Sequence, residues 1–177
     1  RSDIVSASNI TKNALALALK KLMEERDFDQ ISVADICAEC NLNRKSFYYH
    51  FKDKYDLVNW IFYTGFFESI DLKEHKDNWG IFVEICEYLY SERLFYKAAF
   101  KIEGQNSFKE YFLQTIYPIC SFLFEGDLDK NEQKIFVSFI YNGFVAAVLY
   151  WLSEDWRMSP SEFVNSIRKT ICTLAKL

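Results

Sequence analysis

The stretch SVADICAECNLNRKSFYYHFKDK, residues 32–54, decides the fold, because it predicts two short helices joined by a tight turn. Ser32 is a typical N-cap residue, and Asp35, three residues later, completes a capping-box pattern. Asn41 tolerates the left-handed backbone conformation that such a turn needs, and Asn43 is suited to cap the second helix. The stretch therefore predicts a helix-turn-helix, followed at once by the start of a longer helix.

The second helix of this motif is expected to run from Arg44 to about Phe51. It hides two aromatic side chains, Phe47 and Phe51, at a spacing of four residues. Its other faces carry cations, hydroxyl groups and an imidazole. A short helix that buries aromatic rings and presents donors and cations is what a recognition helix in the DNA major groove requires. These outward side chains are Arg44, Lys45, Ser46, Tyr48, Tyr49 and His50.

The motif resembles the N-terminal domain of the TetR/AcrR family of one-component bacterial transcription regulators. The resemblance is carried by ISVADICAECNL (31–42), FYYHF (47–51) and KDKYDLV (52–58). It covers about residues 10–60. Asn41 stands where the family usually has Gly, and Asn43 where it usually has a small residue, and both changes are chemically tolerable. The opening of this domain and its WIF segment, residues 60–62, are also similar to the branch that includes dihydroxyacetone-kinase regulators.

The resemblance implies two kinds of DNA contact in the motif. Cations and hydroxyl groups of the second helix are expected to reach base edges or phosphates, and three further groups to hold backbone phosphates. The base or phosphate contacts fall on Arg44, Lys45, Ser46, Tyr48 and Tyr49. The phosphate contacts fall on His50, Lys54 and Ser32. The alternative is that one or two of these side chains are only exposed or support the fold, with Tyr48 the leading case.

Size and composition favour a helical chain. Half of the 177 residues are apolar, five are Gly and two are Pro, which suits long helices with short connections. The length allows a small domain and a larger one that share a helix. We expect an all-α fold of about nine helices. Its N-terminal part, residues 1–52, would be a three-helix helix-turn-helix DNA-binding domain, and residues 53–177 a helical ligand-binding and dimerisation domain.

The charge of the chain is unevenly distributed. The net charge is −4, but residues 1–54 carry nine Lys and Arg against eight Asp and Glu, which gives +1. Residues 55–177 carry twelve against seventeen, which gives −5. Residues 44–54 hold four cations against Asp53 alone. Without the motif around it this would be an ordinary solvated surface, but phosphate contacts depend on the local field, so a basic tip on an acidic protein is compatible with DNA binding.

Other classes of protein find little support in the sequence. The two His residues form no Ser-His-Asp or Cys-His pattern, and there is no P-loop or G-x-G-x-x-G. Cys37 and Cys40 form a lone C-x-x-C without a second pair, so packing is favoured over a zinc or redox role. We therefore expect no enzyme, no catalytic residue, no metal and no cofactor.

The sequence also predicts the compartment. Residues 4–15 do not form a signal peptide, because polar residues interrupt them and no small-residue cleavage site follows. The most apolar stretch, 139–152, is fourteen residues long, which is short for a transmembrane helix. We expect a cytoplasmic protein without a membrane partner, in which the five Cys residues are reduced.

Periodicity and caps predict the remaining helices. The first helix should run from about Asn9 to Arg26, and the fourth from an N-cap at Asp53 to about Ile70. Further helices are expected at about 78–90, 91–103 with Ser91 as N-cap, 106–125, 130–153 with Asp129 as N-cap, and from Ser159 onwards. The buried candidates of the 130–153 helix are Phe136, Phe139, Ile140, Gly143, Ala147 and Trp151.

The last two helices predict a homodimer. Small residues on the 130–153 helix allow another helix to approach closely, and two such helices can pair with their copies across a two-fold axis as a four-helix bundle. The resemblance implies the same, since members of the family dimerise through their last two helices. The candidate interface residues are Gly143, Ala147, Trp151, Phe163, Ile167, Ile171 and Leu174.

Aromatic residues make up 18% of the chain and predict a binding pocket for a small apolar or aromatic effector. The candidate lining residues are Trp60, Tyr63, Phe67, Tyr96, Phe100, Phe112, Tyr117 and Tyr141. An aromatic stripe at helical spacing is more often core, so a solid aromatic core is the alternative.

The function that follows is a DNA-binding transcriptional regulator, a ligand-responsive repressor that reads a palindromic operator as a dimer. Effector binding between the middle helices would move the fourth helix and change the spacing of the two recognition helices. The alternatives are activation, or control by a protein partner without a small-molecule pocket.

Overall fold

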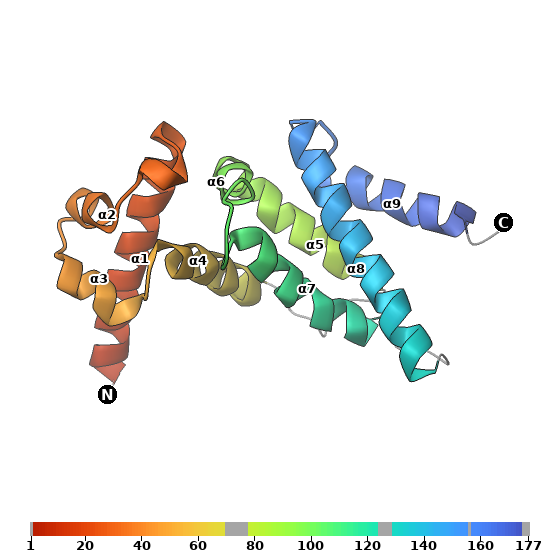
Figure 1. Cartoon of the computed structure of the whole chain (residues 1–177), viewed down its shortest axis with the longest axis horizontal. Coiled ribbons are helices and arrows are strands. Elements are labelled where there is room, and N and C mark those ends of the chain that lie inside the picture. The colour runs from red at the N-terminus through yellow and green to blue at the C-terminus, as the bar shows by residue number, and fades with distance from the viewer. Residues whose placement is uncertain (1, 70–77, 124–128, 156, 175–177) are drawn as a thin grey trace. The chain divides into compact units, whose positions relative to one another are not determined.

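The fold of the chain was obtained as a computed structural model that describes residues 2–69, 78–123, 129–155 and 157–174. Within these ranges the chain is helical and contains no strand, which confirms the all-α class (Figure 1). The elements are α1 (Ser2–Glu25), the 3-10 helix η1 (Phe28–Gln30), α2 (Val33–Glu39), α3 (Arg44–His50), α4 (Lys54–Ser69), α5 (Asn78–Ser91), α6 (Arg93–Ala99), α7 (Phe108–Leu123), α8 (Lys130–Ser153) and α9 (Pro160–Leu174).

Most helix boundaries match the predictions, but α6 ends at Ala99 and not near 103, and two helix starts also differ. Helix α1 begins at Ser2 and not near Asn9, because no residue between them breaks a helix. Ser91 is not the N-cap of the next helix. It is the last residue of α5, its hydroxyl donates to the carbonyl oxygen of Tyr88 at 2.7 Å, and α6 begins at Arg93. The predicted helix end at Ile70 and the loop at 71–77 lie outside the described residues.

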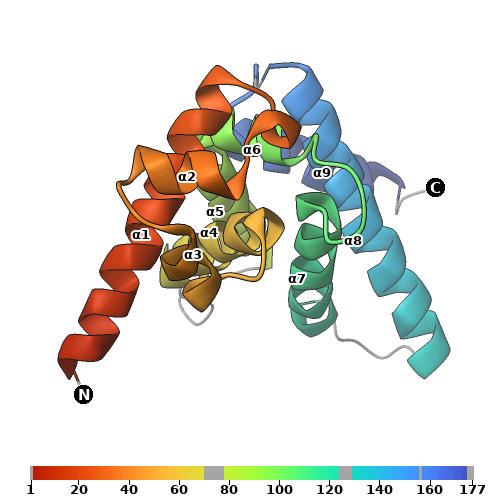
Figure 2. The same cartoon turned by 60° about the vertical axis from the view of Figure 1, so that its left-hand side comes forward.

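The chain divides into two compact units, and helix α4 contributes to both. The first unit consists of Arg1–Thr64 and Leu94–Lys109 and therefore contains all of the predicted domain 1–52. In this unit α2 and α3 lie beside α1 (Figure 2). Its core is apolar and includes Leu15, Leu19, Ile36, Phe47 and Leu57, all fully buried.

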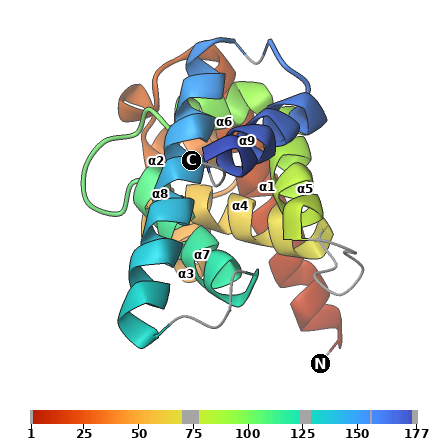
Figure 3. The ribbon, with the colours of Figure 1, turned by 90° about the vertical axis from the view of Figure 1, so that its right-hand side faces the viewer.

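The second unit consists of Gly65–Arg93 and Glu110–Leu177. Helix α9 packs against α5 and lies beside α8 (Figure 3). The rings of Trp151 and Phe163 stack with centroids 4.6 Å apart and join α8 to α9, while Phe82 of α5 meets Phe144 of α8 at 4.7 Å. Stacked and edge-on aromatic contacts of this kind give the unit its core.

Helix α8 differs from its prediction in which side chains it buries. Phe139 was expected in the core, but it is 71% exposed. Phe136 was also expected in the core and is also exposed. Helix α8 carries apolar residues around most of its circumference, but a helix packed on a core buries only one face. Apolar residues on its other faces therefore remain exposed. Helix α8 is longer than the fourteen-residue apolar stretch, and by length and composition alone it is long and apolar enough to cross a membrane, which for a single helix is weak evidence of a membrane span. An apolar helix with one face in a protein core meets the same criterion.

Candidate nucleic-acid interface and dimerisation face

The turn between α2 and α3 is fixed by local hydrogen bonds. Asn41 adopts a left-handed conformation with φ of 57°, and the Leu42 N–H donates to the carbonyl oxygen of Cys37 at 2.8 Å. The Asn43 side chain then accepts the N–H of Ser46 at 2.8 Å, which caps α3. The two departures from the family pattern, Asn41 and Asn43, thus perform the tasks that the sequence assigned to them.

Helix α3 separates its buried and exposed faces sharply. Phe47 has no exposed surface and Phe51, the C-cap residue, is 3% exposed, so these two rings fix the helix on the core. Arg44 and Lys45 are exposed at the first turn, and Tyr49 is 83% exposed. The exposed face therefore offers cations and hydroxyl donors to whatever lies against it.

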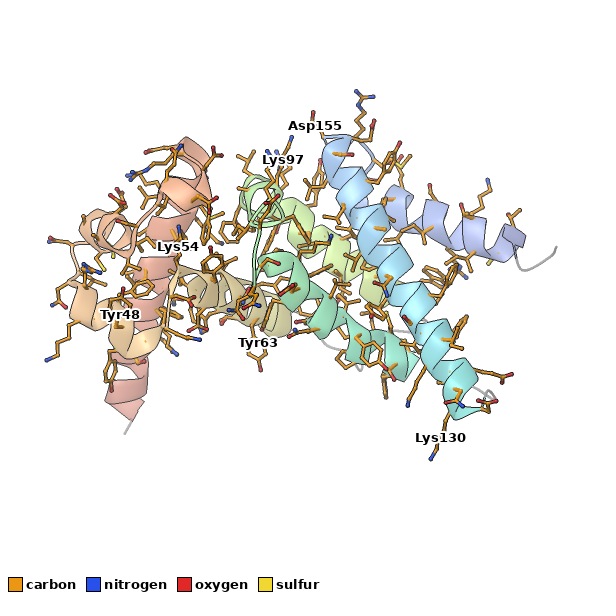
Figure 4. The ribbon with its side chains drawn as sticks, viewed as in Figure 1. Tyr48, Lys54, Tyr63, Lys97, Lys130 and Asp155 are labelled. Atoms are coloured by element: carbon orange, nitrogen blue, oxygen red, sulfur yellow. The ribbon has the colours of Figure 1, made fainter. Side chains whose placement is uncertain are left out.

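The side chains of Ser46 and Tyr48 also take part in local contacts. The Ser46 hydroxyl donates to Asn43 Oδ1 at 3.2 Å, so it extends the cap. Tyr48 is 51% exposed, its ring lies edge-on to Phe47, and the Arg44 guanidinium is 6.0 Å from its centroid. Tyr48, labelled in Figure 4, therefore faces solvent and also lies within the range of a cation–π contact with Arg44.

His50 closes the exposed face at the end of α3. Its ring lies edge-on to Tyr49, with centroids 4.9 Å apart. Burial lowers the pKa of His50, and the positive charge of Lys12 from α1 lowers it further. The Lys12 ammonium lies 5.7 Å from the centroid of Trp60. Both effects favour the neutral imidazole of His50, and a nearby anion would favour its protonation.

Two of the predicted phosphate ligands make structural contacts. Ser32 is exposed, but its N–H and hydroxyl both donate to Asp35 Oδ2, and its oxygen accepts the Asp35 N–H, which completes the capping box of α2. These bonds lower the pKa of Asp35, because they stabilise its carboxylate. Lys54 points inward to backbone carbonyl oxygens of the segment between α1 and α2.

The C-x-x-C pair lies in α2 and at its end. Cys37 is buried, and the Cys40 thiol donates to the carbonyl oxygen of Ile36 at 3.2 Å. Burial raises the pKa of both thiols, so neither is an activated thiolate. Among the described residues, no group of three or more His, Cys, Asp and Glu side chains is arranged to hold a metal ion.

The predicted effector-binding residues are not gathered into one described cavity. In the first unit Tyr96 and Phe100 are buried against Phe108, so they are core residues, while Tyr63 is exposed. Trp60 of the same unit lies edge-on to Phe51. In the second unit Phe112 is fully buried, and the partly exposed rings of Tyr117 and Tyr141 meet at 5.2 Å. The side chain of Phe67 lies outside the described residues.

An apolar groove of about 490 Å³ lies instead in the second unit, along α8, α9 and the start of α5. We call it the α8/α9 groove. Most of the predicted dimer residues line it, and none of the predicted effector residues does. The lining residues used below are Phe139, Gly143, Ala147, Tyr150, Ile167 and Ile171. The side chain of Leu174 lies outside the described residues.

Two of the predicted dimer residues serve first to hold the chain together. Trp151 and Phe163 are 2% and 6% exposed, and the indole N–H of Trp151 donates to the carbonyl oxygen of Met158 at 3.0 Å. They form the floor that joins α8 to α9 and leave little surface for a partner. The exposed residues that sequence reasoning missed are Ile135, Phe139 and Tyr150. Their spacing along one side of the helix was the signal that could have found them.

Comparison with known proteins finds two family matches, one N-terminal and one C-terminal. Residues 15–61 match the family described as bacterial regulatory proteins, tetR family, and residues 77–172 match a family described as transcriptional regulator C-terminal region. The C-terminal match covers more than half of the chain.

Two curated relatives extend these matches. The chain is 34% identical over 109 residues to the HTH-type dhaKLM operon transcriptional activator DhaS of Lactococcus lactis subsp. lactis (strain IL1403), which covers 60% of this chain and 56% of DhaS. The chain thus matches little more than half of the length of that relative. It is 30% identical over 127 residues to the HTH-type transcriptional regulator SAR2658 of Staphylococcus aureus (strain MRSA252), which covers 67% of each chain.

Solved structures show the same fold at lower identity. The structure of the dihydroxyacetone kinase operon activator DhaS matches with a TM-score of 0.70 at 21% identity, covering 94% of this chain and 97% of that one. NalD, the secondary repressor of the MexAB-OprM multidrug efflux pump in Pseudomonas aeruginosa, matches with a TM-score of 0.71 at 16% identity, covering 94% and 96%.

Proposed function

Because the chain belongs to the TetR family of bacterial transcriptional regulators, we propose that it binds a palindromic operator as a homodimer and changes its DNA affinity when a small effector binds. The family supplies the general activity, which is DNA-binding regulation of transcription and not catalysis. The observation that carries the finer proposal is the two-sided helix α3, which has Phe47 buried below and Arg44, Lys45 and Tyr49 exposed above.

The first part of the proposal concerns the DNA contacts. An Arg or Lys at the first turn of a recognition helix can bind guanine O6 and N7 or a phosphate, and a tyrosine ring can touch a thymine methyl group. Arg44 is held over Tyr48, which limits its freedom before DNA binds and lowers the entropy that binding costs. The cap at Asn43, which accepts the Ser46 N–H, fixes the direction of this first turn.

The second part concerns the homodimer. The exposed residues Ile135, Phe139, Gly143, Ala146 and Tyr150 follow one another at intervals of three or four residues and form a stripe along α8. We call them the α8 stripe. Three residues of the stripe, Phe139, Gly143 and Tyr150, line the α8/α9 groove, so a second copy related by a two-fold axis would place its own α8 and α9 there. Each protomer then presents one α3 to one half-site, with half-sites about 34 Å apart or a multiple of that.

The third part concerns the control of DNA binding. A small apolar or aromatic effector is favoured by the aromatic content of the chain, and release of DNA on effector binding is the commonest mode of the family. Activation is the second candidate, because the relative DhaS, at 34% identity over the matched residues, is named a transcriptional activator. Either mode requires a protein that reaches DNA, so we propose that the protein is cytoplasmic.

The proposal is tested by binding of the protein to DNA fragments from the region upstream of its own gene. A fluorescence-anisotropy titration at several salt concentrations should find a fragment bound at least about 1000-fold more tightly than a scrambled duplex of the same length. The logarithm of the binding constant should fall linearly with the logarithm of the salt concentration. Equal affinity for all fragments and the scrambled duplex would overturn the proposal.

A further inference from the structure

The ammonium group of Lys54 occupies a seat made of backbone oxygens and an aromatic ring. Lys54 is the first residue of α4, and its Nζ donates to the carbonyl oxygens of Phe28 and Ile31 at 2.6 and 2.8 Å. The same Nζ lies 4.2 Å from the centroid of the Phe28 ring, within the range of a cation–π contact. Figure 4 shows Lys54 at the start of α4, beside α1.

The seat lies at the point where the chain passes from α1 into the helix-turn-helix. Phe28 begins η1, and Ile31 immediately precedes Ser32, the N-cap of α2. Both side chains are buried, and the Ile31 N–H donates to the carbonyl oxygen of Phe28 at 3.1 Å. One ammonium group therefore ties together the start of η1, the residue before α2 and the first turn of α4.

This arrangement does not suit a phosphate ligand. An ammonium group has three donors, and two of them are engaged by the carbonyl oxygens. Burial lowers the pKa of Lys54, while the charge of Asp29 acts in the opposite direction. Unless the side chain left this position, a phosphate could meet only the third donor, and leaving would break both hydrogen bonds and the contact with the Phe28 ring.

Lys52 is arranged in the opposite way, two residues earlier. Its N–H donates to Asp56 Oδ2 at 3.0 Å, and Asp53 Oδ1 accepts the Asp56 N–H at 2.8 Å, so the backbone of this turn is fixed. The side chain of Lys52 is exposed. A fixed backbone that carries a solvated ammonium group is a suitable phosphate contact.

We propose that Lys54 is a positioning residue that locks the start of α4 to the segment before α2, and that Lys52 supplies the phosphate contact at this end of the motif. The proposal rests on the proposed DNA-binding function and refines it. A displacement of the first turn of α4 is then passed to the N-cap of α2 through two hydrogen bonds, and not only through the apolar core.

Three variants separate a lock from a phosphate ligand. Lys54→Gln removes the positive charge and shortens the side chain. Lys52→Gln makes the same change at a side chain that does not bind the Phe28 and Ile31 carbonyl oxygens. Lys54→Arg keeps the charge and can still bind a phosphate, but a planar guanidinium does not fit a seat built for a compact ammonium group. Two quantities are measured for each variant: hydrogen–deuterium exchange of residues 28–40 in the free protein, and the salt slope of DNA binding.

The lock predicts faster exchange of residues 28–40 in both Lys54 variants, by about tenfold or more, because charge-assisted hydrogen bonds are lost. The salt slope should stay at the wild-type value in Lys54→Gln and fall by about 0.9 in Lys52→Gln, whose exchange should be unchanged. Wild-type exchange in Lys54→Gln, with a salt slope lowered by about 0.9, would overturn the proposal. Wild-type exchange and affinity in Lys54→Arg would do the same.

The exchange measurement needs no DNA, so the lock can be tested even if the proposed function fails. Absence of specific DNA binding by the wild type would refute the proposed function and the role of Lys52. Faster exchange in the Lys54 variants would still support the lock in that case, and unchanged exchange would refute it.

Discussion

The helix-turn-helix at 33–50 and the α8–α9 pair expose surfaces of opposite chemical character, one charged and polar and the other apolar. The exposed side of α3 carries Arg44, Lys45 and Tyr49, which are cations and a hydroxyl donor. The exposed side of α8 carries Ile135, Phe139 and Tyr150, of which the first two have no polar atom in the side chain. The exposed side of α3 suits a hydrated, charged polymer. The exposed side of α8 suits an apolar partner whose contact excludes water.

The two regions are also held together differently. The helix-turn-helix uses short-range polar bonds, such as those of Ser32 with Asp35 and Asn43 with Ser46. The α8–α9 pair depends on apolar stacking, above all that of Trp151 on Phe163. A polar cap fixes the direction of a helix over a few residues. Apolar stacking fixes which helix faces meet, but it leaves other apolar side chains of the same helices exposed. The exposed face of α3 is therefore polar and fixed by caps a few residues away, whereas α8 exposes the apolar side chains of Ile135 and Phe139.

The largest expected effect is a change on the α8 stripe. Phe139→Glu should weaken the homodimer by about 1000-fold, because each protomer loses burial of a phenyl ring and the two-fold axis counts the loss twice. The molar mass from light scattering at micromolar concentration should fall to that of one chain. Lys134→Gln makes the same change in net charge on another side of α8 and should leave the mass unchanged. A dimeric Phe139→Glu protein would show that the stripe is not the interface.

The next largest effect is expected from the exposed side of α3, which we call the reading surface. Arg44→Ala/Lys45→Ala should weaken operator binding by about 100-fold and lower the salt slope by up to about 1.8, since two cations leave the DNA. Thermal unfolding should be unaffected because both side chains are exposed. Glu110→Gln, an exposed change on α7, serves as a control with wild-type affinity. An unchanged salt slope in the double variant would remove α3 from the phosphate contacts.

A third prediction concerns packing in the second unit. A Cβ atom on Gly65 of α4 would lie 2.0 Å from the hydroxyl oxygen of Tyr88 and 2.7 Å from Tyr88 Cζ. Gly65→Ala should lower the free energy of unfolding by about 1 kcal/mol, because overpacking exceeds the gain in helix propensity. Denaturant titration measures the change. Adding Tyr88→Leu should make the Gly65→Ala change harmless, and two strictly additive losses would exclude the contact as its cause.

A fourth prediction compares one cap from each region. Asn43→Ala and Ser159→Ala each remove a side-chain cap and should cost about 1 kcal/mol of unfolding free energy. Only Asn43→Ala should also weaken operator binding, since Asn43 sets the direction of α3. Measurement of both quantities on both variants separates a local defect in the reading surface from a general loss of stability. Equal affinities in the two variants would contradict the comparison.

The smallest effect is the pH dependence at His50. Its folded-state pKa is lowered by burial and by Lys12, so the unfolded chain binds the proton more tightly, and stability declines as pH falls through about 6.5. A phosphate beside His50 favours the protonated form, so operator affinity should rise over the same interval, by less than about tenfold. His50→Gln should abolish both dependences. Operator affinity that falls with falling pH would place His50 away from the phosphates.

The sequence predicted the helix-turn-helix well because its determinants are local. The capping partners of Ser32 and Asn43 lie three residues away, and the buried rings Phe47 and Phe51 are one helical turn apart. The partners of Lys54 lie 23 and 26 residues away in the chain, so no short pattern could reveal the lock. Its expected role as a phosphate ligand came from the resemblance and not from its surroundings.

The second unit was harder to predict, because apolar character does not say which apolar surface covers a residue. Phe139 was expected in the core of its own chain but lies exposed on the α8 stripe. Trp151 was expected both in the core and at the dimer interface, and it is buried between α8 and α9. The predicted effector residues were selected as aromatic, and Tyr96 and Phe112 prove to be fully buried. An effector pocket built from these rings stays a prediction.

The central claim is that two chains read one palindrome, each with its own α3. The most direct test is the stoichiometry and affinity of the wild-type protein on the identified operator and on an isolated half-site of the same length, with the second half scrambled. We predict two chains per full operator by light scattering, and weakening of at least about tenfold on the half-site duplex, because the second recognition helix loses its contacts. One chain per full operator, or equal affinity for the two duplexes, would contradict the claim.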